Sequence, residues 1–167
     1  MTTRQENTSK SNFEKVNEFN NAFGMVSHNT YQKNIFTEDP KLVELRLSLI
    51  TEEVEELKQA IKEHDFTEVR DAIADILYVV YGMADAFGIN ANDDFSIVHN
   101  SNMSKLCNSE EEAKLTVKEY EKRYKAGTSP YDTPQYTYLE NIGKWVVKNM
   151  STGKVLKSIN YTKVKFD

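Results

Sequence analysis

The 167-residue sequence has a single cysteine, Cys107, and only six glycines and three prolines. One thiol excludes an internal disulfide and a cysteine-based zinc cluster. No stretch approaches the roughly 18 consecutive apolar residues that a membrane helix needs, and residues 1–12 lack the apolar core of a secretory signal. We therefore expect a cytoplasmic protein with no membrane partner. The sequence also lacks a glycine-rich phosphate loop, so P-loop chemistry is not supported.

Basic residues are in the minority, with 21 Lys and Arg against 26 Asp and Glu. The net charge of −5 argues against a nucleic-acid partner. The charge is unevenly distributed, because residues 52–75 hold nine acids and three bases, whereas residues 144–167 hold six lysines and one acid. A concentrated acidic block either lies on an open, solvated surface or is stabilised by cations, and these two interpretations imply different functions.

The apolar pattern is mainly helical. It predicts helices over residues 12–23, 42–63, from Asp65 or Thr67 to near Gly88, and 109–124. The connector 93–106 is expected to be partly helical, and residues 126–137 are turn-rich. Alternating apolar residues on either side of residues 151–153 predict a β-hairpin.

The predicted fold class is therefore all-α, an antiparallel helix bundle with a short C-terminal β-hairpin. Residues 1–11 are expected to form a flexible arm, residues 12–125 the helical domain and residues 126–167 a C-terminal extension. Two helices cannot enclose a pocket alone, so we expect other helices to complete the core.

Acidic residues gather on one face of each of two successive predicted helices. They are Glu52, Glu53 and Glu56 on the first helix and Glu68, Asp71 and Asp75 on the second. Spacings of three, four and seven residues place such side chains on one side of a helix. If the helices pair antiparallel, the six carboxylates converge, and Mg²⁺ ions with oxygen ligands would offset their repulsion. The alternative is an ordinary solvated surface.

The residues around these acids resemble a known superfamily. The segments TEEVEELKQAI (residues 51–61) and EVRDAIADILY (residues 68–78) are similar to the all-α NTP pyrophosphatases, which comprise MazG-like and phosphoribosyl-ATP pyrophosphohydrolase-like proteins and the dimeric dUTPases. That superfamily carries Glu-x-x-Glu on one helix and Glu-x-x-Asp on the next. Glu53 and Glu56 match the first pair, and Glu68 and Asp71 match the second.

Two further acids, Glu52 and Asp75, are expected to join the metal ligands. We assign Glu68 and Asp71 to the second motif because the other alignment, ending at Asp75, places Ala72 at the glutamate position.

The resemblance implies a four-helix core completed by dimerisation, so a homodimer or a dimer of dimers is expected. It also implies Mg²⁺-dependent hydrolysis of a nucleoside triphosphate, with Mn²⁺ as a substitute metal. The expected substrate is a dNTP, and the expected products are the monophosphate and pyrophosphate, formed when water attacks the α-phosphorus. Glu52 or Glu53 is expected to orient that water. The alternative function is a non-enzymatic helical module whose acidic face binds a basic partner, and a phosphoribosyl-ATP hydrolase is a third, weaker hypothesis.

Substrate contacts are predicted at four positions outside the acidic set. The Asn-Met-Ser-Lys segment offers Lys105 for the triphosphate and Asn102 as an amide donor, and members of the superfamily with a comparable segment place it near the nucleotide. Phe23 and Tyr78 are candidates for stacking on the base, although helical aromatic residues more often belong to a core.

Overall fold

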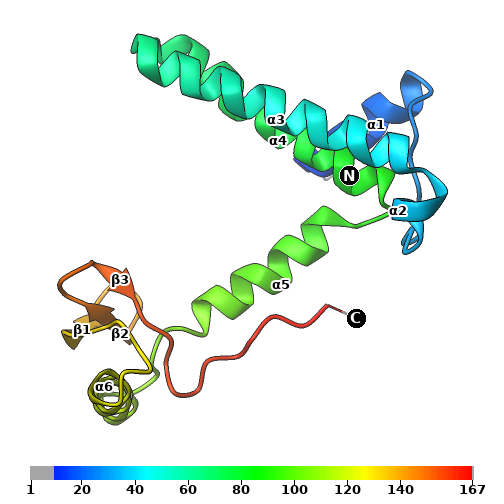
Figure 1. Ribbon diagram of the computed structural model, residues 1–167. Helices are drawn as coiled ribbons and strands as arrows, with labels where there is room; N and C mark the ends of the chain where they lie inside the picture. Colours follow the sequence, from blue (N-terminus) through cyan, green and yellow to red (C-terminus); the bar gives the residue numbers. More distant parts are fainter. Residues whose placement is uncertain (1–9, 167) are drawn as a thin grey trace, which may run out of the picture. The chain divides into compact units, whose positions relative to one another are not determined.

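The computed structural model describes residues 10–166, and these residues form six helices and three strands (Figure 1). By its contacts the chain divides into two compact units, Met1–Asp94 and Phe95–Asp167. Most of the predicted flexible arm lies outside the described residues. Within them, no single helix has the length and apolar content to cross a membrane, and only α4 and α5 taken together across their bend reach both.

The N-terminal unit contains four helices: α1 (Asn12–Ala22), α2 (Ile35–Glu38), α3 (Pro40–Glu63) and α4 (Phe66–Ala86). A capping box starts α1, because Ser11 accepts from the Glu14 N–H and Glu14 accepts from the Ser11 N–H. The predicted helices over residues 12–23 and 42–63 are confirmed. The short helix α2 lies in a stretch without a predicted helix.

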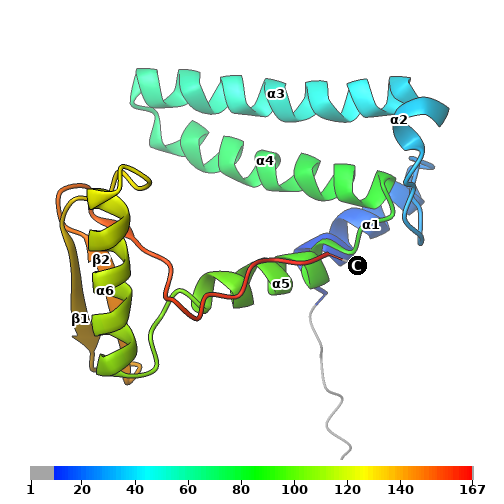
Figure 2. The same ribbon diagram turned by 60° about the horizontal axis from the view of Figure 1, so that its bottom comes forward.

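A tight link joins α3 to α4. His64 ends α3 in the left-handed conformation (φ 58°), and the Asp65 side chain then accepts from the N–H groups of Thr67 and Glu68. Of the two predicted caps, Asp65 is therefore the one used. The two helices run antiparallel and lie side by side (Figure 2), with Ala60 and Ala72 buried. This pairing confirms the condition on which convergence of the acids depends.

A buried polar cluster ties α1 to α4. Asp85 is 1% exposed and accepts hydrogen bonds from Asn17 (2.7 Å), Asn20 (2.6 Å) and Ser27 (3.0 Å). The buried Arg46 guanidinium of α3 interacts electrostatically with Asp85, although its burial lowers the Arg46 pKa. A Cβ on Gly82 would lie 3.0 Å from Arg46 Nη1, so glycine gives the guanidinium room beside α4.

The C-terminal unit combines helices with a sheet. Helix α5 (Ala91–Met103) crosses the division between the units and leads to α6 (Glu110–Lys125). The strands β1 (Pro134–Leu139), β2 (Lys144–Asn149) and β3 (Lys154–Val155) form an antiparallel sheet in the order β1-β2-β3.

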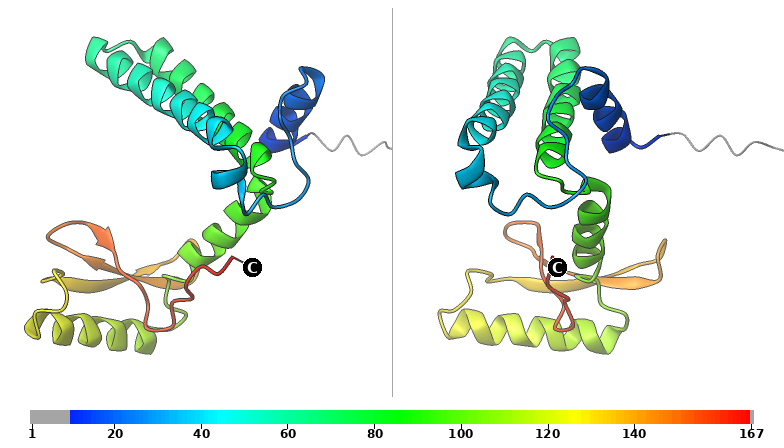
Figure 3. Two further views of the ribbon diagram at one scale, coloured as in Figure 1. Left: turned by 45° about the vertical axis from the view of Figure 1, so that its right-hand side comes forward. Right: turned by 90° about the vertical axis from the view of Figure 1, so that its right-hand side faces the viewer.

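Helix α6 packs against this sheet (Figure 3). The core between them consists of Cys107, Ala113, Tyr120, Val147 and Leu156. Cys107 also pairs with Trp145 in an isolated β-bridge. This packing differs from the predicted grouping of residues 12–125 as one helical domain, since α6 lies against strands in a unit that begins at Phe95.

Two details of the C-terminal prediction are corrected. The turn through residues 151–153 does connect β2 to β3. Residues 134–137, however, were expected to be turn-rich and belong to an additional strand, β1. Its aromatic side chains pack across the strand pair, with the Trp145 ring centroid 5.5 Å from that of Tyr136 and 4.9 Å from that of Tyr138. Ile159, expected in the hairpin, lies beyond β3.

Candidate functional site

The acidic side chains of α3 and α4 meet in one region of the N-terminal unit. Glu53 and Asp75 are half-buried, while Glu52, Glu56 and Asp71 are exposed. Because α4 returns antiparallel along α3, residues near the middle of one helix face residues near the middle of the other. Five of the six predicted carboxylates gather in this region, because the negative charges of the other four act on Glu53.

The pKa of Glu53 is raised, first by burial and then by the negative charges of its neighbours. In decreasing order of effect these neighbours are Glu56, Asp75, Glu52 and Asp71. Two of them come from the same helix and two from the facing helix, so the repulsion acts across the helix pair. The ionised cluster is therefore electrostatically strained in the absence of a cation.

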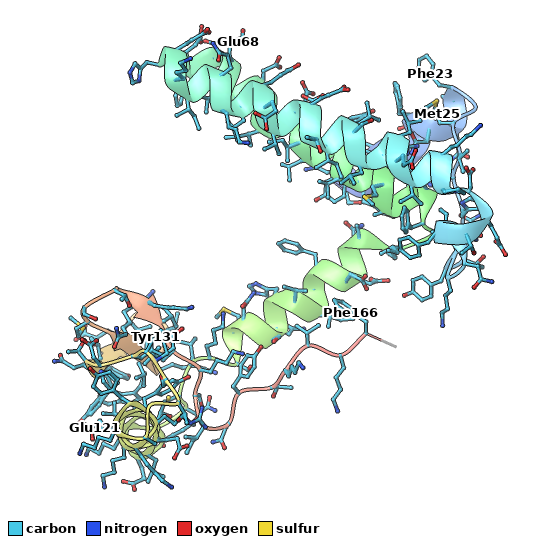
Figure 4. The ribbon with its side chains drawn as sticks, in the orientation of Figure 1. Phe23, Met25, Glu68, Glu121, Tyr131 and Phe166 are labelled. Atoms are coloured by element: carbon cyan, nitrogen blue, oxygen red, sulfur yellow. The ribbon has the colours of Figure 1, made fainter. Side chains whose placement is uncertain are left out.

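The sixth predicted acid, Glu68, has a different position. It lies exposed in the first turn of α4, at the α3–α4 link (Figure 4), and Asp65 caps its N–H. The carboxylates that act on Glu53 include Asp71 and Asp75 of α4.

Basic side chains do not neutralise this cluster. The one ion pair on this stretch of α3 joins Lys58 to Glu55 (2.7 Å), and among residues 10–166 no ion pair involves the five clustered acids. Within residues 10–166, no three His, Cys, Asp or Glu side chains are already arranged to hold a metal ion. The set nevertheless fits Mg²⁺, which takes one or two carboxylates and completes its octahedron with water and substrate phosphates.

An aromatic group lies next to these acids along α4. Tyr78, one turn after Asp75, packs edge-on against Phe19 with ring centroids 5.6 Å apart, and Phe19 lies 4.5 Å from Phe23. Phe23 is 70% exposed and Tyr78 is 40% exposed. The two predicted stacking residues therefore belong to one partly open aromatic surface through Phe19, and they are not core residues.

The two remaining predicted contacts belong to the C-terminal unit. Lys105 Nζ donates to Asn102 Oδ1 over 2.7 Å. Lys105 also lines a cavity with three further cations, Arg123, Lys154 and Lys157. These three were not singled out from the sequence, where the only signal was the excess of lysine in residues 144–167.

Two comparisons identify relatives of the chain. Residues 16–102, more than half of the chain, match the phosphoribosyl-ATP pyrophosphohydrolase family. An uncharacterised protein of Acanthamoeba polyphaga mimivirus, L479, is 48% identical over 90 residues, which cover 54% of this chain and 36% of that protein. The present chain thus matches about a third of its viral relative. The family match spans both acidic helices and lies within the superfamily that these segments resemble. The chain belongs to the phosphoribosyl-ATP pyrophosphohydrolase family.

Proposed function

We propose that the protein is a Mg²⁺-dependent pyrophosphohydrolase that converts a nucleoside triphosphate, with a dNTP as the expected substrate, to the monophosphate and pyrophosphate. The observation that carries this proposal is the unneutralised carboxylate cluster shared by α3 and α4. Family membership supports the reaction class. Mn²⁺, which also prefers oxygen ligands, is expected to substitute.

The residues have distinct roles in the proposed reaction. The proposed cation ligands are the six predicted acids, Glu52, Glu53, Glu56, Glu68, Asp71 and Asp75. When bound, the cations would neutralise phosphate charge and acidify a water molecule. Glu52 or Glu53 orients this water and accepts its proton as the oxygen attacks the α-phosphorus. The P–O bond between the α-phosphorus and the bridging oxygen breaks, and pyrophosphate leaves with that oxygen.

The substrate contacts remain part of the same proposal. Phe23 and Tyr78 offer ring faces for the base. Lys105 and Asn102 offer an ammonium and an amide for the phosphate chain. The protein needs such a cation because the clustered carboxylates already offset much of the charge that bound Mg²⁺ brings.

The decisive assay identifies the anion released. The full-length protein with Mg²⁺ is given a panel of dNTPs, NTPs and phosphoribosyl-ATP, and pyrophosphate and orthophosphate are measured separately. We expect pyrophosphate, and we expect Glu53→Gln to reduce its release by at least about a hundredfold. The control is Glu55→Gln, which removes a carboxylate of the same helix that is already paired with Lys58.

Two outcomes of this assay would reject the proposal. Orthophosphate as the first product would place the attack at the γ-phosphorus. Equal activity of Glu53→Gln and the control would remove the cluster from the reaction. Absence of hydrolysis across the panel, together with capture of a basic protein that Glu53→Gln abolishes, would instead favour an acidic interaction surface.

The proposed enzyme is a homodimer or a dimer of dimers. Its α4 presents Ile73 (48% exposed), Leu77 (47%) and Val80 (42%) at spacings of four and three residues, which is an apolar stripe on one face. A second copy would bury this stripe and complete a four-helix core. In light scattering, Leu77→Glu should therefore shift the mass toward the monomer. Ile142→Glu, at an equally exposed apolar position of the other unit (44%), should not.

A further inference from the structure

A basic cavity of about 480 Å³ lies entirely within the C-terminal unit. Its lining includes four cations that are far apart in the sequence: Lys105 after α5, Arg123 on α6, Lys154 on β3 and Lys157 just beyond it. Tyr131 and Ser129 of the loop before β1 complete the polar lining. No acidic residue lines it, so the cavity is a local concentration of positive charge.

The lysines of this cavity contact rings and amides, not carboxylates. Lys154 Nζ lies 5.3 Å from the Tyr131 ring centroid, and Lys157 Nζ lies 4.5 Å from that of Tyr161. Within residues 10–166, Arg123 is the only one of the four cations in an ion pair, through its Nε to Glu119 (2.7 Å). The interaction with Tyr131 raises the pKa of the Lys154 ammonium group, which favours its charged form. Within residues 10–166, the three lysines that line the cavity therefore have no carboxylate partner.

The framework that holds these cations is rigid. Tyr120 is 8% exposed, packs with its ring centroid 5.9 Å from that of Tyr131, and accepts from the Lys157 N–H through its hydroxyl (3.1 Å). Leu156, between Lys154 and Lys157, is 2% exposed and belongs to the core under the sheet. The backbone carrying both lysines is thus anchored on either side of the cavity.

The volume and lining together select the ligand class. A cavity of this volume falls within the range of about 300–1,000 Å³ typical of small-molecule sites, and it is larger than one phosphate requires. Clustered cations repel one another and attract a compact ligand of high negative charge.

We propose that this cavity binds the polyphosphate chain of a nucleotide substrate or of its pyrophosphate product. Naming a nucleotide rests on the proposed function. In this proposal Lys105, Lys154 and Lys157 contact the phosphates.

The test measures binding without metal and without turnover. Isothermal titration calorimetry in EDTA compares α,β-methylene-dATP, inorganic pyrophosphate and a single-stranded oligodeoxynucleotide. The proteins are the full-length chain, the double variant Lys154→Gln/Lys157→Gln, and the control Lys148→Gln. Lys148 is an exposed lysine on β2 outside the cavity lining, so the control removes a nearby charge from the same sheet.

We expect the double variant to weaken binding of the methylene nucleotide and pyrophosphate at least about tenfold, since each charged hydrogen bond contributes roughly 1.5–3 kcal/mol. The control should stay within about twofold, because distant surface charges are screened. Tighter binding of the nucleotide than of pyrophosphate assigns the site to substrate, and the reverse assigns it to product. Circular dichroism of the double variant checks that it is folded.

Three results would overturn the proposal. The first is that neither polyphosphate binds to the wild-type chain. The second is that the double variant and the control lose the same amount of polyphosphate affinity. The third is that the oligodeoxynucleotide binds more tightly than either polyphosphate, which would make the cavity part of a nucleic-acid surface. This test is separable from that of the proposed function. If the chain binds polyphosphate in EDTA but releases no pyrophosphate with Mg²⁺, the binding cavity is supported and the proposed enzymatic function is rejected.

Discussion

The two units of this protein have opposite charge. Residues 1–94 hold nine basic and 18 acidic residues, a net charge of −9, whereas residues 95–167 hold 12 basic and eight acidic residues, a net charge of +4. We propose that acidic groups of the helical unit bind cations and that basic groups of the mixed unit bind a polyphosphate. A triphosphate with its metal ions requires both kinds of group, which is why the overall net charge of −5 is a poor guide to function.

The helical unit also leaves an apolar surface exposed on α4. Ile73, Leu77 and Val80 are each more than 40% exposed and lie on one face of this helix. We propose that a second copy of the chain covers this stripe.

The strongest test of the helical unit targets its buried polar cluster. Asp85→Asn removes the negative charge that faces buried Arg46 and disturbs the hydrogen bonds from Asn17 and Asn20. We expect a loss of about 2–4 kcal/mol of unfolding free energy. The melting temperature should fall by about 4–16 °C. Glu44→Gln, a carboxylate change at an exposed position of α3, should change it little, and an equal effect of both variants would contradict a special role for Asp85.

The second largest expected effect is a difference in pyrophosphate release between variants of two acidic residues of α4, Asp75 and Glu68. Asp75→Asn should reduce activity by about a hundredfold or more, because Asp75 belongs to the carboxylate group around Glu53. Glu68→Gln should reduce it far less, because Glu68 lies in the first turn of α4. If Glu68→Gln lost as much activity as Asp75→Asn, or more, Glu68 would be at least as important to the proposed metal site as Asp75.

A smaller kinetic effect is expected from the basic unit. Lys105→Met should raise KM for the triphosphate and reduce kcat/KM by roughly tenfold to a hundredfold, the value of one charged hydrogen bond. Lys148→Met serves as the control, since Lys148 lies outside the cavity. Unchanged kinetics for Lys105→Met would assign the phosphate contact to other cations.

The smallest effect tests repulsion within the acidic unit. In metal-free buffer at neutral pH, Glu53→Gln should raise the melting temperature by about 2 °C, because like-charge pairs on helices each cost a few tenths of a kcal/mol. Glu55→Gln should not, since it breaks the ion pair with Lys58. A lower melting temperature for Glu53→Gln would show that the cluster is not strained by its own charge.

Local features of this protein were readable from the sequence. Helical spacing of apolar residues predicted α1, α3, α4 and α6, and the polar residues Ser11, Asp65 and Ser109 cap three of them. The acidic residues shared faces of their helices for the same reason. The two acidic segments also resembled the superfamily to which the matched family belongs.

Pairing across elements was decided only by the tertiary structure. Apolar packing around Ala60 and Ala72 sets the register of α3 against α4, and this register places Asp75 rather than Glu68 among the acids that act on Glu53. Strand β1 exists because its tyrosines pack on Trp145 of the next strand. The basic cavity joins residues 105, 123, 154 and 157, which come together only when α6 packs on the sheet. Helical period and caps depend on neighbours three or four residues away, whereas these contacts depend on the whole packed core, and no local pattern encodes them.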